Sequence, residues 1–168
     1  NEEINNELPP ARVKRHINWK PKKFEFSNMF SYGENNTIDF SKLRDVIGIF
    51  APNHAGKSAI LDSVMFCIFH KCSRTKSASD VLNNKKRNFY CKLNFEIDGV
   101  QYFIERKGKK EKSGHVRVDV DFWMIGDNDE IISLNGEQRT QTDKNIRGYL
   151  GLYNDFVLTS MSIQNNNT

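Results

Sequence analysis

The spacing of apolar side chains predicts a chain that mixes strands with helices. Residues 22–26 (KKFEF) and 37–40 (TIDF) alternate polar and apolar positions around a turn-forming stretch, which predicts a β-hairpin. Residues 45–50 (DVIGIF) form a continuous apolar run of strand length, typical of a strand that is buried on both faces. Residues 1–21 mix charge, Asn and Pro without periodicity, so we expect a linker or an extended arm there. Regular structure is therefore expected to begin at Lys22.

Two segments have the spacing of helices. Between Lys57 and Phe69 the apolar residues recur every three or four positions, which predicts a helix over about that range. A second helix is expected from about Thr142 to Leu150. Residues 70–88 are polar and basic, and strands are expected to resume after them.

The remaining pattern is that of strands. Residues 89–107 predict two strands joined at Asp98-Gly99, a dipeptide that strongly favours a hairpin turn. Residues 115–126 alternate Val with charge, which predicts a half-exposed strand, and residues 130–134 are expected to pair with it. Residues 155–168 begin apolar and end polar, so we expect a short strand there and a longer protein beyond Thr168.

Composition adds only broad limits. At 168 residues and 38% hydrophobic, the chain can bury one domain-sized core. The net charge of +4 is compatible with nucleic acid or acidic surfaces without requiring either. No apolar run approaches the roughly 18 residues of a membrane helix, and no signal peptide opens the chain. We expect a soluble, intracellular protein, cytoplasmic or nuclear, with no membrane partner.

The cysteines indicate reduced thiols. Cys67, Cys72 and Cys91 are odd in number and have no CxxC spacing, which favours a reducing compartment over a disulfide framework. The group formed by Cys67, His70 and Cys72 matches no standard zinc spacing and lacks a fourth ligand. Buried thiols at a helix end are the interpretation that we favour over a metal site.

The most specific motif lies in residues 49–66 (IFAPNHAGKSAILDSVMF). A predicted strand, a short loop and a helix that starts at once form the context of a phosphate-binding loop. The backbone N–H groups at such a helix start favour phosphate anions. Lys57 would neutralise the β- and γ-phosphates, and the Ser58 hydroxyl would hold magnesium. The predicted ligands of ATP in this loop are Asn53, His54, Ala55, Gly56, Lys57, Ser58 and Ala59.

Two residues depart from the usual loop. Ala51 and His54 stand where glycines are common. A methyl group at position 51 is tolerable if φ is negative. His is among the residues enriched at positive φ, so its cost should be about 1 kcal/mol. The alternative is a chance match on an ordinary strand–turn–helix, but strand, loop and helix fall in register, which favours a nucleotide site.

Other motifs narrow the class of ATPase. The base-reading Asn/Thr-Lys-x-Asp segment of GTPases is absent from the sequence, and residues 70–88 lack the arginine-rich lid of small-molecule kinases. Residues 24–40, 48–69 and 151–164 carry, in the same order, segments similar to those of the N-terminal lobe of SMC-like ATPase heads. Residues 22–168 most closely resemble the SbcC-type double-strand-break repair ATPases of phages and large viruses. The resemblance implies an α/β fold: an ABC-type P-loop ATPase half-head, with a mixed sheet around the phosphate-loop helix and an antiparallel β-rich part.

The resemblance also implies residue roles. Gln164 takes the position of the loop glutamine that meets magnesium and the attacking water, and with Lys57 it forms the predicted catalytic pair. Leu82, Asn83 and Asn84 fall on a segment that lies against the nucleotide; a solvated loop is the alternative. Phe30 stands where many relatives have an Arg that touches phosphate, which leaves open what supplies that charge here.

Two family motifs are missing from the sequence. It has no LSGGQ-like signature and no apolar strand ending in Asp-Glu; residues 122–128 (FWMIGDN) come nearest. The resemblance assigns both motifs to a C-terminal lobe beyond a long coiled coil, so this chain should be half of a head that binds ATP weakly and hydrolyses it poorly alone. The implied partners are its own C-terminal lobe, a second head in a homodimer, a DNA double-strand-break nuclease and DNA.

Positive charge concentrates in residues 83–87 (NNKKR) and 105–115 (ERKGKKEKSGH), both expected in loops. Contact with DNA phosphates and simple solubilising hairpin tips both fit these segments. Three functions stay open: an ATPase head lobe of a DNA-repair protein, a nucleotide-responsive interaction module without turnover, and a stand-alone phosphate-loop kinase.

Overall fold

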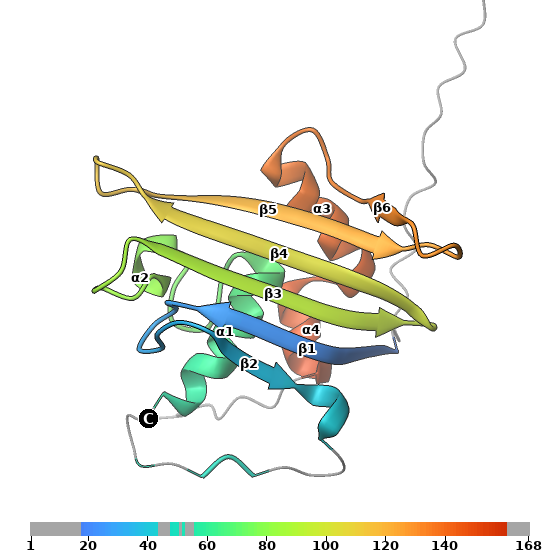
Figure 1. The fold of residues 1–168 in the computed structure, drawn as a ribbon, viewed down its shortest axis with the longest axis horizontal. Coiled ribbons are helices and arrows are strands. Elements are labelled where there is room, and N and C mark those ends of the chain that lie inside the picture. The colour runs from blue at the N-terminus through green and yellow to red at the C-terminus, as the bar shows by residue number, and fades with distance from the viewer. Residues whose placement is uncertain (1–17, 44–47, 51, 53–55, 161–168) are drawn as a thin grey trace, which may run out of the picture.

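One antiparallel sheet organises the described part of the chain. The computed structural model describes residues 18–43, 48–50, 52 and 56–160. Six strands lie in the order β2-β1-β3-β4-β5-β6. The longer helices α1 (Lys57–Phe69), α3 (Arg139–Leu150) and α4 (Tyr153–Ser160) lie behind the sheet in Figure 1, so they cover one of its faces. Two short helices, η1 (Phe40–Lys42) and α2 (Ala78–Val81), complete the fold.

The first hairpin is confirmed, with an earlier start. β1 (Trp19–Ser27) pairs antiparallel with β2 (Asn36–Asp39) on one side and with β3 on the other. The strand begins at Trp19, so the predicted start at Lys22 is three residues late. The pairing of β1 with β3 shifts register between Pro21 and Lys23. A bulge there accommodates a proline, which has no N–H to donate to the ladder.

The second hairpin forms as predicted. β3 (Asn88–Ile97) and β4 (Val100–Lys110) pair in unbroken antiparallel register across Asp98-Gly99. Both turn residues have positive φ, 50° and 83°, as a two-residue hairpin with the twist of its strands requires. β5 (Val116–Ile125) pairs with β4, and β6 (Ile131–Ser133) pairs with β5, which confirms both predicted strands.

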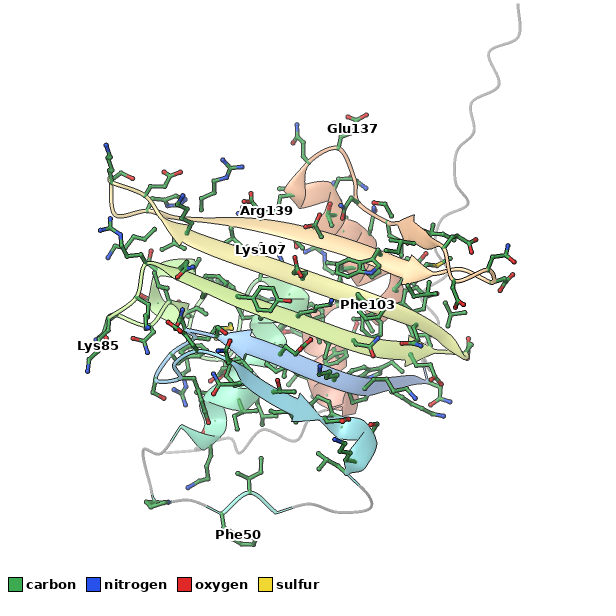
Figure 2. The ribbon with its side chains drawn as sticks, in the orientation of Figure 1. Phe50, Lys85, Phe103, Lys107, Glu137 and Arg139 are labelled. Carbon is green, nitrogen blue, oxygen red and sulfur yellow. The ribbon has the colours of Figure 1, made fainter. Side chains whose placement is uncertain are left out.

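The two faces of the sheet differ. Along β3 the alternate residues Phe89, Cys91, Leu93 and Phe95 are buried against the helices. The opposite face is open, and Figure 2 shows Phe103 and Lys107 of β4 lying on it. The core therefore lies between the sheet and the helices. α1 supplies much of it, since every residue from Asp62 to Phe69 is buried.

Three sequence predictions differ from the structure. α3 begins at Arg139, three residues before the predicted Thr142. The expected strand at 155–168 is wrong as far as the structure describes it: Tyr153–Ser160 is helical, because Phe156 packs against Phe69 and Trp19. In the predicted buried strand 45–50, positions 45–47 lie outside the described residues, and Gly48, Ile49 and Phe50 form no strand. A strand of that kind needs both faces covered, but Phe50 is 95% exposed.

Where the chain is described, no helix is long and apolar enough to cross a membrane.

Candidate functional site

The start of α1 has the backbone geometry of an anion site. The helix begins at Lys57 and ends at Phe69, as the sequence predicts. Gly56 precedes it in the left-handed region, at φ 89° and ψ 10°, and as a glycine it supplies no side-chain cap of its own. A helix N-terminus offers amide donors and the positive end of its dipole to a bound anion. This end of α1 is therefore suited to phosphate.

The predicted loop ligands are only partly described. Asn53, His54 and Ala55 lie outside the described residues, as does Ala51. Lys57 Nζ donates to the Pro52 carbonyl at 3.1 Å, so the lysine side chain extends toward Pro52. Ser58 is exposed at the helix start, where its hydroxyl is accessible. Ala59 is buried, and its amide donates to the Gly56 carbonyl at 3.0 Å.

The turn after β1 packs against the helix start. Tyr32 Oη donates to the Gly56 carbonyl at 3.2 Å. A Cβ on Gly56 would lie 3.0 Å from Ser31 Oγ and 3.3 Å from the Tyr32 ring, at a φ that side chains rarely adopt. Glycine at position 56 thus satisfies both a backbone and a packing requirement. Residues 28–34, which we call the β1 turn, form one wall of the candidate site.

The segment Leu82–Asn84 lies along that wall. Met29 and Leu82 form an antiparallel bridge, the Phe30 amide donates to the Val81 carbonyl at 2.6 Å, and the Asn83 amide donates to the Asn28 carbonyl at 2.9 Å. The Asn83 side-chain amide also donates to the Tyr32 carbonyl at 3.1 Å. Leu82 is buried, whereas Asn84 is exposed. The structure therefore brings this segment beside the β1 turn, and the alternative of a wholly solvated loop is wrong for Leu82.

A cation lies near Phe30, the residue that departs from the family pattern. The Arg74 guanidinium carbon is 5.9 Å from the centre of the Phe30 ring. Arg74 Nε also lies 2.8 Å from Asp62 Oδ2, in an ion pair with a buried carboxylate of α1. The sequence patterns single out neither Asp62 nor Arg74. The available signal was a charged residue, Asp62, in the middle of an otherwise apolar helix.

Gln164, the other predicted catalytic residue and metal ligand, lies outside the described residues.

The two cysteines near the end of α1 do not face a common site. Cys67 and Cys72 direct their thiols to different carbonyls, those of Ile104 and Thr75. No cluster of three or more His, Cys, Asp or Glu side chains suited to a metal occurs within the described ranges. Burial lowers the pKa of His70 to about 4, with a smaller effect of the nearby Arg106 and Arg139.

The basic segments are only partly loops. Residues 105–110 belong to β4, so their predicted place in a loop is wrong. Arg106 is fully buried and binds the Cys67 and Ile68 carbonyls and Asp143. Gly108 is needed inside the strand because the Phe89 ring fills the space that a Cβ would occupy. The two basic segments meet at one point, where the Lys110 amide donates to the Arg87 carbonyl at 2.8 Å.

Comparisons with known proteins agree with this geometry. Residues 23–165 match the family described as AAA domain. Uncharacterized protein R555 of Acanthamoeba polyphaga mimivirus is 41% identical over 157 residues, which cover 89% of this chain and 12% of that protein. The SbcC component of the nuclease SbcCD of Clostridium acetobutylicum is 30% identical over 104 residues, 58% of this chain and 9% of that protein. DNA double-strand break repair Rad50 ATPase of Methanocaldococcus jannaschii is 30% identical over 87 residues, which cover 52% of this chain and 8% of that protein.

The likeness extends to the fold. The structure of the recombination mediator protein RecF with ATP superposes with a TM-score of 0.51 at 18% identity, over 70% of this chain and 29% of that one. The predicted α/β fold of an ABC-type P-loop ATPase is therefore confirmed, although the described strands form one antiparallel sheet where a mixed sheet was predicted. The chain spans about an eighth or less of the three curated relatives. It belongs to the AAA domain family and is homologous to the N-terminal regions of SbcC and Rad50 proteins, in a variety that a large virus also carries.

Proposed function

We propose that this chain is the ATP-binding N-terminal lobe of a DNA-repair or recombination ATPase head, that the lobe begins with β1 at Trp19, and that a linker or arm precedes it. The observation that carries the proposal is the start of α1. There a left-handed Gly56, the N-terminus of α1 and Lys57 meet the β1 turn. These features suit a polyphosphate, because they combine amide donors, a helix dipole and a flexible cation.

The chemistry at this site follows from the residue types. Lys57 would exchange its bond to the Pro52 carbonyl for the β- and γ-phosphates. The exposed Ser58 hydroxyl and Gln164 would hold magnesium, which neutralises charge on the phosphates when bound. Gln164 would also orient the attacking water. Leu82, Asn83 and Asn84, beside the β1 turn, would line the nucleotide.

Hydrolysis is proposed to require a second lobe. Phosphoryl transfer needs an acidic metal ligand and a water-orienting carboxylate, and the sequence lacks the strand motif that carries them. Large apolar side chains support docking of such a lobe: Phe50 is 95% exposed and Leu158 82% exposed. Figure 2 shows Phe50 pointing away from the fold. Singly exposed apolar residues are common, so these two support the proposal without carrying it.

The proposed partners are a second head, a double-strand-break nuclease and DNA. For DNA, the supporting observation is the backbone hydrogen bond between Lys110, at the end of β4, and Arg87, which brings the two basic segments together. Several cations occur there, and they would bind phosphates independently of sequence. Lys85 points outward in Figure 2, whereas the Lys86 ammonium already binds Glu34 at 2.6 Å.

The test is to co-express this chain with a C-terminal lobe of the same family. We expect size-exclusion chromatography to show a dimer only with a non-hydrolysable ATP analogue, and steady-state assays to show hydrolysis. Gln164→Ala should still bind ATP but dimerise and hydrolyse about tenfold less, because its metal and water contacts are lost. A variant that matches wild type in both assays would contradict the role of Gln164. A head that binds ATP without turnover would instead favour the interaction module.

A further inference from the structure

Asp62 is a buried carboxylate in the phosphate-loop helix. It lies in the second turn of α1 and is 4% exposed. Its Oδ1 accepts hydrogen bonds from the Ser73 amide at 3.2 Å and from the Ser73 hydroxyl at 2.6 Å. Its Oδ2 forms the ion pair with Arg74 Nε at 2.8 Å. One oxygen of this buried carboxylate is hydrogen-bonded to Ser73, and the other contacts Arg74 through the ion pair alone. Asp62 therefore contacts two consecutive residues of the chain that follows the helix.

Those two residues begin the path to the wall of the candidate site. Thr75 Oγ1 donates to Asp80 Oδ2 at 2.7 Å and accepts from the Ser77 amide at 2.8 Å, which folds the connection tightly into α2. Leu82, only eight residues after Arg74, then bridges to Met29 of the β1 turn. Because the connection is short and internally bonded, the position of Leu82 and Asn83 depends on where Ser73 and Arg74 are held.

The path returns to the start of α1. Asn83 bonds Asn28 and Tyr32 of the β1 turn, and Tyr32 bonds the Gly56 carbonyl. Arg74 adds a second link, since its guanidinium lies over Phe30. A closed ring of contacts thus runs from α1 through Asp62 and the wall back to Gly56. The ring closes at Gly56, the helix start to which the proposed function assigns phosphate binding.

We propose that Asp62 is a positioning residue for nucleotide binding: through Ser73 and Arg74 it fixes the Leu82–Asn83 wall and the β1 turn relative to Gly56 at the start of α1. This inference rests on the proposed function. The Arg74 side chain is half-exposed, so its ion pair with Asp62 is a weak source of stability, because solvent screens the attraction. Its geometric role, the holding of a wall against a ligand, is the one that an apolar pair could not supply.

The test uses Asp62→Asn in the 168-residue chain. Asn keeps one oxygen for Ser73 but loses the charge that holds Arg74. We expect MgATP affinity, from isothermal titration, to fall about tenfold, and hydrogen exchange at the Phe30 and Asn83 amides to accelerate at least about tenfold. Arg74→Gln should reproduce both effects. Arg74→Lys, which keeps a cation near Asp62, should retain most of the affinity.

A matched control is available at the other end of the same helix. Asp143 binds the buried Arg106, which holds the last carbonyls of α1. Asp143→Asn should lower the melting temperature yet leave ATP affinity within about twofold of wild type. If it weakens ATP binding as much as Asp62→Asn, the effect is general destabilisation and the inference is overturned.

The remaining outcomes separate the two proposals. Wild-type affinity in Asp62→Asn, alongside a loss in Lys57→Ala, would overturn the positioning role and leave the proposed function intact. A wild-type chain that binds no ATP would contradict the proposed function. Hydrogen exchange would then still test whether Asp62 fixes the wall. Unchanged protection of the Phe30 and Asn83 amides in Asp62→Asn would overturn that role.

Discussion

Gly56 combines two constraints at the residue where the phosphate loop becomes a helix. Its φ of 89° disfavours any side chain, and a Cβ would press on Ser31 and Tyr32. We expect Gly56→Ala to lower the free energy of unfolding by about 1–2 kcal/mol and to weaken ATP binding, because the loop must shift away from the β1 turn. Denaturant melts and isothermal titration would measure the two effects.

Gly148 provides the control for that substitution. It lies inside α3, and outside its own helix backbone no atom lies within 4 Å of the place that an added methyl group would take. Gly148→Ala should therefore raise the free energy of unfolding by roughly 0.5–1 kcal/mol and leave ATP binding unchanged. If Gly56→Ala behaves in the same way, the packing of the β1 turn against the loop does not constrain the site.

Single residues also mark the limit of sequence reasoning. Lys57 and Ser58 could be identified because a phosphate loop is a local motif, read from contiguous residues. The same reasoning could not identify Asp62, Arg74 and Arg106. Their partners are distant in the sequence, or come near only because the chain folds back after α1. Arg106 reads as part of a solvated basic run, although its guanidinium is buried beside α1. Charge runs do not reveal which member faces the core.

At the scale of elements, Arg106 connects one strand, β4, with two helices, α1 and α3. It extends from β4, is fully buried, and binds both the end of α1 and Asp143 of α3. Arg106→Met should lower the free energy of unfolding by about 3–5 kcal/mol, since it strands a partly buried carboxylate and two helix carbonyls. Urea denaturation would measure this loss.

A double variant makes that prediction sharper. Removing the carboxylate as well, in Arg106→Met with Asp143→Leu, should recover part of the stability, because the uncompensated charge is gone. If the stability lost in the double variant equals the sum of the losses in Arg106→Met and Asp143→Leu, the two side chains are not energetically coupled. That result would contradict the role of this ion pair in joining β4, α1 and α3.

The elements that the sequence predicts correctly are those with strong local signals. The Asp98-Gly99 hairpin and the helix Lys57–Phe69 follow from turn chemistry and from apolar spacing, and both are confirmed. The misses depend on tertiary contacts. Tyr153–Ser160 reads as a strand in its apolar content, but its helix brings Phe156 against Trp19 and Phe69. The run 45–50 reads as buried, yet Ile49 and Phe50 are exposed, so its burial would depend on further strands or a second lobe.

At the scale of the whole molecule, His70 makes stability depend on pH. Burial lowers its pKa in the folded protein to about 4, whereas the unfolded value is 6.5. The unfolded state therefore binds more protons between these values, and His70 contributes stability above pH 6.5 that is lost as pH falls toward 4. His70→Asn, which suits the left-handed backbone at φ 57°, should flatten this slope. Equal slopes in thermal melts from about pH 7 to about pH 4 would contradict the assignment.

The central claim, that α1 begins in a working ATP site, is tested most directly by isothermal titration of the 168-residue chain with MgATP. Wild type should bind with one site per chain, and Lys57→Ala should show no measurable binding with an unchanged melting temperature, because it removes the phosphate-facing charge and keeps the helix. Lys144→Ala, which removes an exposed lysine from α3, should bind as wild type does. Equal affinity in Lys57→Ala and wild type would contradict the account.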